Sequence, residues 1–113
     1  MTMAETTELT RRKCKQVAVD GHALADAAAD MLLVQIPGWN RVERSITQTF
    51  KFKDHYQAMA FANAVAWISH QEDHHPEMVV GYNRVTVQYF THSVNGLSEN
   101  DFICAAKVSA LFS

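Results

Sequence analysis

The chain has 113 residues, 48% of them hydrophobic and 19% charged, a composition that fits one folded domain and excludes wholesale disorder. Its formal net charge of −2 argues against a general affinity for nucleic acid, which needs a basic surface. The sequence has no run of about 20 apolar residues that could span a membrane and no secretory-signal pattern at its N-terminus, so we expect a cytoplasmic protein.

Residues 1–20 are predicted to be a polar N-terminal lead, solvated and partly mobile, ahead of a single domain over residues 21–113. A basic cluster in this lead comprises Arg11, Arg12, Lys13 and Lys15. The two cysteines, Cys14 and Cys104, lie far apart in the sequence, and we expect both to be reduced thiols. Cys104 falls within an apolar helical pattern, which places it in the core.

The first predicted helix covers residues 22–35 and ends at Pro37 and Gly38. Its apolar stripe consists of Leu24, Ala27, Ala28, Met31 and Leu32. Two strands follow, over residues 39–43 and 44–53, and the short gap between them favours an antiparallel pair. One face of the second strand carries Ile46, Phe50 and Phe52.

The second helix, over residues 54–71, has the clearest helical pattern. Asp54 and Gln57 form a capping-box pair at its start, and Pro76 requires that the helix end earlier. The expected buried stripe is Phe61, Ala64, Val65 and Ile68, widened by Tyr56, Ala60 and Trp67. His70 points away from this stripe, toward solvent, in the last turn.

Two more strands are predicted over residues 78–81 and 85–92, joined by a turn at 82–84. The longer strand alternates in character, and its apolar face carries Val85, Val87 and Tyr89. Its more polar face carries Thr86, Gln88, Phe90 and His92. His92 therefore projects from the accessible face at the strand end.

The last predicted helix covers residues 98–111, with Ser98 and Asp101 as a second capping-box pair. The element order is helix, two strands, helix, two strands, helix. This order predicts an α+β fold with a single four-stranded antiparallel sheet and three helices packed on one face.

A histidine-rich stretch carries the candidate chemistry, because histidine titrates near neutral pH. A metal site would use His70, His74 and His92, although the proline turn disfavours a helical His74. Nucleophilic catalysis is disfavoured because neither Ser93 nor Ser98 has the glycine-framed turn that exposes a nucleophile. General acid–base catalysis fits better, since histidines from a turn and a strand end can converge on a small polar ligand. Composition alone also allows a cluster without function.

The spacing of one set of residues is specific: His70, His74, His75, Pro76, Tyr82, His92 and Asp101. This set resembles the motif of the pterin-4a-carbinolamine dehydratases, with every gap in range. Three further segments, 38–40, 50–54 and 96–98, look like scaffold segments of the same family. The resemblance covers about residues 22–112, nearly the whole domain.

The resemblance implies removal of water from 4a-hydroxytetrahydropterin to give quinonoid dihydropterin, without a metal or an organic cofactor. This reaction recycles the cofactor of aromatic amino acid hydroxylases, phenylalanine hydroxylase in particular. The implied catalytic residues are His74, His75 and His92. The implied substrate-binding residues are His75, Tyr82, Phe90, Thr91 and Asp101, and the supporting residues are His70, Asp73 and Pro76. Capping alone would also account for Asp101, so its role stays open.

Two positions depart from the family pattern. His70 stands where an acidic residue is more usual, and Met78 stands where an aromatic residue is common. The resemblance also implies homodimers or homotetramers. The alternative hypothesis is a non-catalytic module that binds pterin or acts as a protein dimerisation partner, like the transcriptional coactivators of this family. Retention of all three histidines favours the enzyme.

Overall fold

The computed structural model describes residues 8–17 and 21–112. A four-stranded antiparallel sheet lies at its centre, with the strand order β1-β2-β4-β3. Its strands are β1 (Asn40–Val42), β2 (Ser45–Lys51), β3 (Glu77–Val80) and β4 (Arg84–Tyr89). The helices are α2 (Asp26–Leu33), α3 (His55–Glu72) and α4 (Glu99–Ser109), with short 3-10 helices η1 (His92–Val94) and η2 (Ala110–Phe112).

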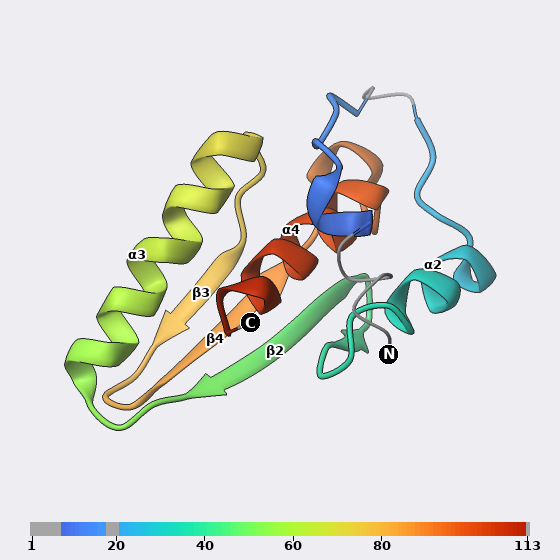
Figure 1. Ribbon diagram of the computed structural model, residues 1–113. Coiled ribbons are helices and arrows are strands. Elements are labelled where there is room, and N and C mark those ends of the chain that lie inside the picture. The colour runs from blue at the N-terminus through green and yellow to red at the C-terminus, as the bar shows by residue number, and fades with distance from the viewer. Residues whose placement is uncertain (1–7, 18–20, 113) are drawn as a thin grey trace.

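The helices lie along one side of this sheet, which confirms the predicted α+β class (Figure 1). α3 and α4 pack against β4 and against each other, whereas α2 lies beside β1. None of the helices within the described residues is long and apolar enough to cross a membrane.

The two central strands, β2 and β4, contribute buried side chains to the core. β2 and β4 pair from Ile46 opposite Tyr89 to Lys51 opposite Arg84. The predicted alternation is confirmed, because the side chains of one β4 face are fully buried, namely Val85, Val87 and Tyr89. The strand itself ends earlier than predicted, at Tyr89, and His92 opens η1 instead. The chain leaves the ladder there because Thr91 bridges to Gly96 and closes a tight loop.

Helix α3 begins where its sequence predicts. The Asp54 carboxylate accepts a hydrogen bond from the Gln57 amide at 3.0 Å, and the Gln57 side chain accepts one from the Lys53 amide at 3.0 Å. The buried face centres on Phe61 and Val65. The expectation that Tyr56 and Trp67 widen this face is wrong, because these side chains are 85% and 61% exposed. At 100° per residue, both lie on the side of the helix opposite to Val65.

The first predicted helix is shorter than expected, and the face of it that is buried differs from the predicted one. Only Asp26–Leu33 is helical, and the segment before it is extended, where the Leu24 amide donates to the Leu97 carbonyl at 2.8 Å. Ala29 is the buried residue of α2, whereas Met31, which we placed in the apolar stripe, is 73% exposed. The sequence pattern could not fix the buried face, because Ala29 and Leu33 are apolar as well as the residues of the predicted stripe.

The N-terminal lead contributes to the core. We expected it to be solvated, yet residues 8–11 are helical and Leu9 is 1% exposed within the main hydrophobic cluster. Arg12 pairs with Glu8 and with Glu99 at the start of α4, at 2.5 and 2.7 Å. One apolar side chain and these contacts dock residues 8–12 on the domain. Residues 1–7 and 18–20 of the predicted lead lie outside the described residues.

We expect Leu9→Ala to lower the free energy of unfolding by about 2–5 kcal/mol, since it removes a buried side chain and leaves a cavity. Urea denaturation followed by circular dichroism measures this change. Met31→Ala, at an exposed position, is the control and should change stability by less than about 0.5 kcal/mol. Equal effects from the two variants would show that the lead does not pack as described.

Candidate active site

The turn after α3 places the histidines. The helix ends at Glu72, and Asp73 adopts the left-handed conformation with φ of 52° as its C-cap. The amide of His74 then donates back to the Ser69 carbonyl at 3.0 Å, and Pro76 leads the chain into β3. This reversal directs His74 under the end of α3 and leaves His75 exposed at the surface of the turn.

His74 is held on two sides. Its Nε2 lies 2.5 Å from Oδ1 of Asp101, and its ring stacks on Tyr89 with centroids 5.8 Å apart and planes 9° apart. The Tyr89 hydroxyl is itself hydrogen-bonded to Ser69 at 3.1 Å. Because Nε2 faces a carboxylate, it is the protonated nitrogen, and Nδ1 is left for another partner.

Asp101 is completely buried, and both of its carboxylate oxygens have partners. Oδ2 accepts hydrogen bonds from the Thr91 hydroxyl at 2.8 Å and from the Ser98 amide at 2.9 Å, while Oδ1 faces His74. The capping-box prediction is therefore confirmed. Capping and contact with His74 are simultaneous roles of one side chain, because each uses a different oxygen.

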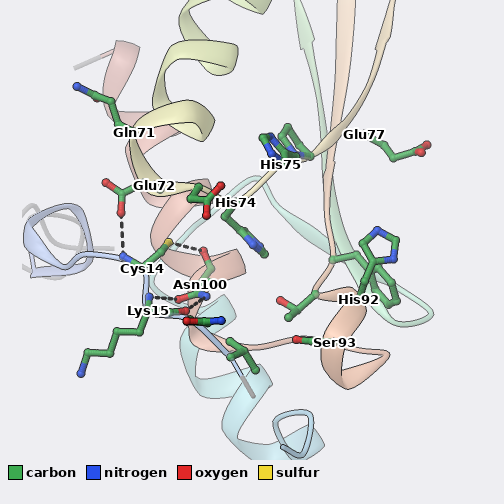
Figure 2. Close-up of a pocket in the computed structure, with 16 residues that line it drawn as sticks. Cys14, Lys15, Gln71, Glu72, His74, His75, Glu77, His92, Ser93 and Asn100 are labelled. Atoms are coloured by element: carbon green, nitrogen blue, oxygen red, sulfur yellow. Dashed lines mark hydrogen bonds between the residues drawn. The ribbon is translucent and has the colours of Figure 1, made fainter. Parts of the chain in front are cut away.

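A cleft of about 840 Å³ opens beside this pair. Figure 2 shows His74, His75 and His92 around the same hollow, supplied by the turn after α3 and by η1. His92 is exposed, and its ring lies perpendicular to the ring of Phe90, at a centroid distance of 4.8 Å and an angle of 90°. Other expected site residues on its lining are Asp73, Pro76, Phe90 and Thr91.

Two residues of the sequence motif lie elsewhere in the described chain. Tyr82 follows the opposite end of β3, is 71% exposed and stacks on His55 at 6.1 Å. His70 is exposed on α3, as predicted, and its ring lies 5.6 Å from Trp67. Neither residue lines the cleft with the three histidines. Among the described residues, no group of three or more His, Cys, Asp or Glu side chains is arranged to hold a metal ion.

One wall of the cleft is made of residues that were not among the predicted site residues. Residues 14–17, from the N-terminal lead, line it, and Figure 2 shows Cys14 and Lys15 across the hollow from His92. The amide of Cys14 donates to the Glu72 carboxylate at 2.8 Å. The Asn100 side chain accepts from the Lys15 amide at 3.0 Å and donates to the Lys15 carbonyl at 2.6 Å.

A signal for this wall was present in the sequence. Glu72 lies on the same side of α3 as Phe61 and Val65, and a carboxylate on a buried helix face requires a partner. Its partners are the Cys14 amide and the Lys107 ammonium, 2.8 Å away. Burial acts to raise the pKa of Glu72, but these two contacts, together with the Lys13 ammonium 3.8 Å away, outweigh it and lower the pKa.

The fold and the cleft together define a class of protein: a small α+β domain with a carboxylate-held histidine and two accessible histidines around one cleft. A family model described as Pterin 4 alpha carbinolamine dehydratase matches residues 22–111. The chain belongs to this family, and the suspected resemblance is confirmed.

Relatives agree with this assignment. A protein from Nitrosomonas eutropha is 54% identical over 110 residues, covering 96% of this chain and 97% of its own length. A protein from Stenotrophomonas maltophilia is 51% identical over 111 residues and covers 96% of each chain. Both carry, provisionally, the name pterin-4-alpha-carbinolamine dehydratase. A crystal structure from Brucella melitensis, described as a transcriptional coactivator/pterin dehydratase, has 37% identity and a TM-score of 0.77, covering 81% of this chain and 100% of its own.

We expect Glu72→Gln to destabilise the protein at pH 7 and to have a smaller effect in acid. The pKa of Glu72 is lowered below its ordinary value of 4.5 on folding, so its carboxylate stabilises the fold above that pH. The contribution is lost as pH falls through the lowered pKa. Denaturant unfolding of both proteins at pH 7 and pH 3 measures the difference. Glu77→Gln, at an exposed position, is the control; a Glu72→Gln effect that is the same at both pH values contradicts the prediction.

Proposed function

We propose that the protein catalyses the dehydration of 4a-hydroxytetrahydropterin to quinonoid dihydropterin. The observation that carries this proposal is the His74–Asp101 pair at 2.5 Å, placed on the same cleft as His75 and His92. Membership of the dehydratase family supports the choice of substrate. A link to phenylalanine hydroxylase and a cytoplasmic location are parts of the same proposal and follow from the family resemblance.

The proposed reaction needs two proton transfers at separate atoms of the substrate. The bond between C4a and its hydroxyl oxygen breaks, the leaving hydroxyl takes up a proton, and N5 loses its proton, so that one water is released. Asp101 fixes the tautomer and ring plane of His74, which leaves Nδ1 as the atom that exchanges a proton with substrate. In this proposal His92 acts at the other position, and its exposure lets it exchange protons with water.

The remaining cleft residues bind the substrate in this proposal. His75 contacts the pterin ring, and Phe90 offers an aromatic ring beside His92. Thr91 and Asp101 act indirectly, because both are buried and are bonded to each other. In this proposal the pterin is the substrate, the reaction uses no metal or organic cofactor, and the protons are carried by side chains alone.

The test is a dehydration assay in which a hydroxylase generates 4a-hydroxytetrahydropterin in place and quinonoid dihydropterin is followed with and without this protein. We expect acceleration that survives treatment with a chelator. Acceleration that disappears with the chelator and returns with a metal would contradict the side-chain mechanism. Absence of acceleration by folded protein would favour the non-catalytic binding module.

We expect His74→Ala and His92→Ala each to lower turnover by about 10²-fold or more, the usual scale for loss of a general acid or base. The control is His22→Ala, at an exposed position outside the cleft lining, which should leave turnover unchanged. A matching loss from His22→Ala would place the site elsewhere. Circular dichroism of each variant separates loss of chemistry from loss of fold.

We also propose that the protein forms homodimers or homotetramers, as the family resemblance implies. The outer face of α3 exposes Tyr56, Met59 and Trp67, at 85%, 40% and 61%, and the neighbouring strand β3 is an edge strand of the sheet. Apolar side chains gathered on a helix face and a free strand edge are features of a surface that another chain covers. We propose that a second copy of this chain covers this surface.

Trp67→Glu should reduce the assembly to smaller species, because it places a charge in the proposed contact. Sedimentation velocity at several concentrations measures the species present. Met31→Glu is the matched control, since Met31 is 73% exposed on α2, away from α3. A wild-type protein that sediments as a monomer at all concentrations, or an unchanged assembly in Trp67→Glu, would exclude this surface.

A further inference from the structure

Two cysteines far apart in the sequence meet beside the cleft. The Sγ atoms of Cys14 and Cys104 are 3.6 Å apart, across a sequence separation of 90 residues. Both are free thiols. Cys104 is fully buried on α4, as predicted, whereas Cys14 is half-buried and lines the cleft. The pair therefore joins the wall formed by residues 14–17 to the centre of the domain.

Apart from the Cys14 side chain, which packs against the core, hydrogen bonds attach the wall to the domain. Glu72 binds the Cys14 amide, and Asn100 binds the amide and carbonyl of Lys15. These contacts are reversible, so the segment can separate from α4 in local opening without unfolding the sheet. A covalent bond at Cys14 would remove that freedom, because it ties the middle of the segment to a buried helix.

We propose that Cys14 and Cys104 are a disulfide-forming pair that responds to small-molecule disulfides such as oxidised glutathione, and that the bond fixes residues 14–17 as a permanent wall of the cleft. A disulfide has a sulfur–sulfur distance of about 2.05 Å, so the two Sγ atoms must approach by roughly 1.5 Å. The hydrogen-bonded attachment of the segment lets Cys14 make this movement.

The exchange proceeds in two balanced steps. The Cys14 thiolate attacks one sulfur of oxidised glutathione, breaks its disulfide and releases one glutathione thiolate, which leaves a mixed disulfide on Cys14. Cys104 then loses its proton to solvent, and its thiolate attacks the Cys14 sulfur and releases the second glutathione. Two protein thiols are oxidised, and one glutathione disulfide is reduced to two thiols.

The order of these steps follows from exposure. Cys14 is the more accessible thiol and lies at the cleft, so its thiolate attacks first. A hydrogen bond with Cys14, together with burial, raises the pKa of Cys104, so this thiol acts second and slowly. The bond closes a loop of 90 residues, a length for which a cross-link strongly restricts the unfolded chain.

The test treats the folded full-length protein with oxidised glutathione and maps the thiols by alkylation and mass spectrometry. We expect loss of both alkylatable thiols and a peptide that links Cys14 to Cys104 within one chain. The melting temperature of the oxidised protein should rise by about 10 °C, as expected for a long closed loop. Stable glutathione adducts on Cys14 with no link to Cys104, or links between chains only, would overturn the proposal.

Hydrogen exchange tests the effect on the wall. The amides of Cys14 and Lys15 are hydrogen-bonded to Glu72 and Asn100, and we expect their exchange to slow by ~10-fold or more on oxidation, because local opening is suppressed. Cys14→Ser and Cys104→Ala are the controls, and neither should show the change with oxidant. If the exchange rates of these amides are unchanged in the cross-linked protein, the proposal that the disulfide fixes the wall is overturned. Every readout is independent of dehydratase activity, so failure of the proposed reaction leaves this test intact.

Discussion

The buried carboxylate of Asp101 is the constraint on which the site depends. A fully buried charge persists in a protein only where its oxygens have partners, and here the partners come from three places: the turn after α3, the end of β4 and the start of α4. Satisfying one side chain therefore fixes the relative positions of these segments. The same contacts hold the ring of His74 against Tyr89 and engage its Nε2.

A second group of polar residues on buried helix faces has a similar effect at the opposite wall. Glu72 and Asn100 are both 8% exposed, and each is satisfied by backbone groups of the N-terminal lead. The lead thereby becomes part of the cleft, next to a thiol pair that spans it and α4. Glu72 and Asn100 are polar residues on buried helix faces. They bind the N-terminal lead, which has little apolar surface of its own.

Local sequence patterns correctly predicted those features that depend only on residues close together in the chain. Alternation in β4 identified Val85, Val87 and Tyr89 as core, and the pairs Asp54–Gln57 and Ser98–Asp101 located two helix starts. The same approach failed for Tyr56 and Trp67, because hydrophobicity does not say which side of a helix meets the sheet. It also failed for Leu9, a single apolar residue in a polar stretch, since one residue makes no periodic signal.

The sequence by itself determined the fold class, the family and the candidate histidines, because period-two and helical patterns and the spacing of a motif are properties of the chain alone. The tertiary structure decided which motif residues meet. It brings His74, His75 and His92 to one cleft, places Asp101 behind His74, and leaves Tyr82 and His70 outside. It alone brings Cys14 to Cys104, since contact between residues 90 positions apart depends on how helices and lead pack and has no local signature.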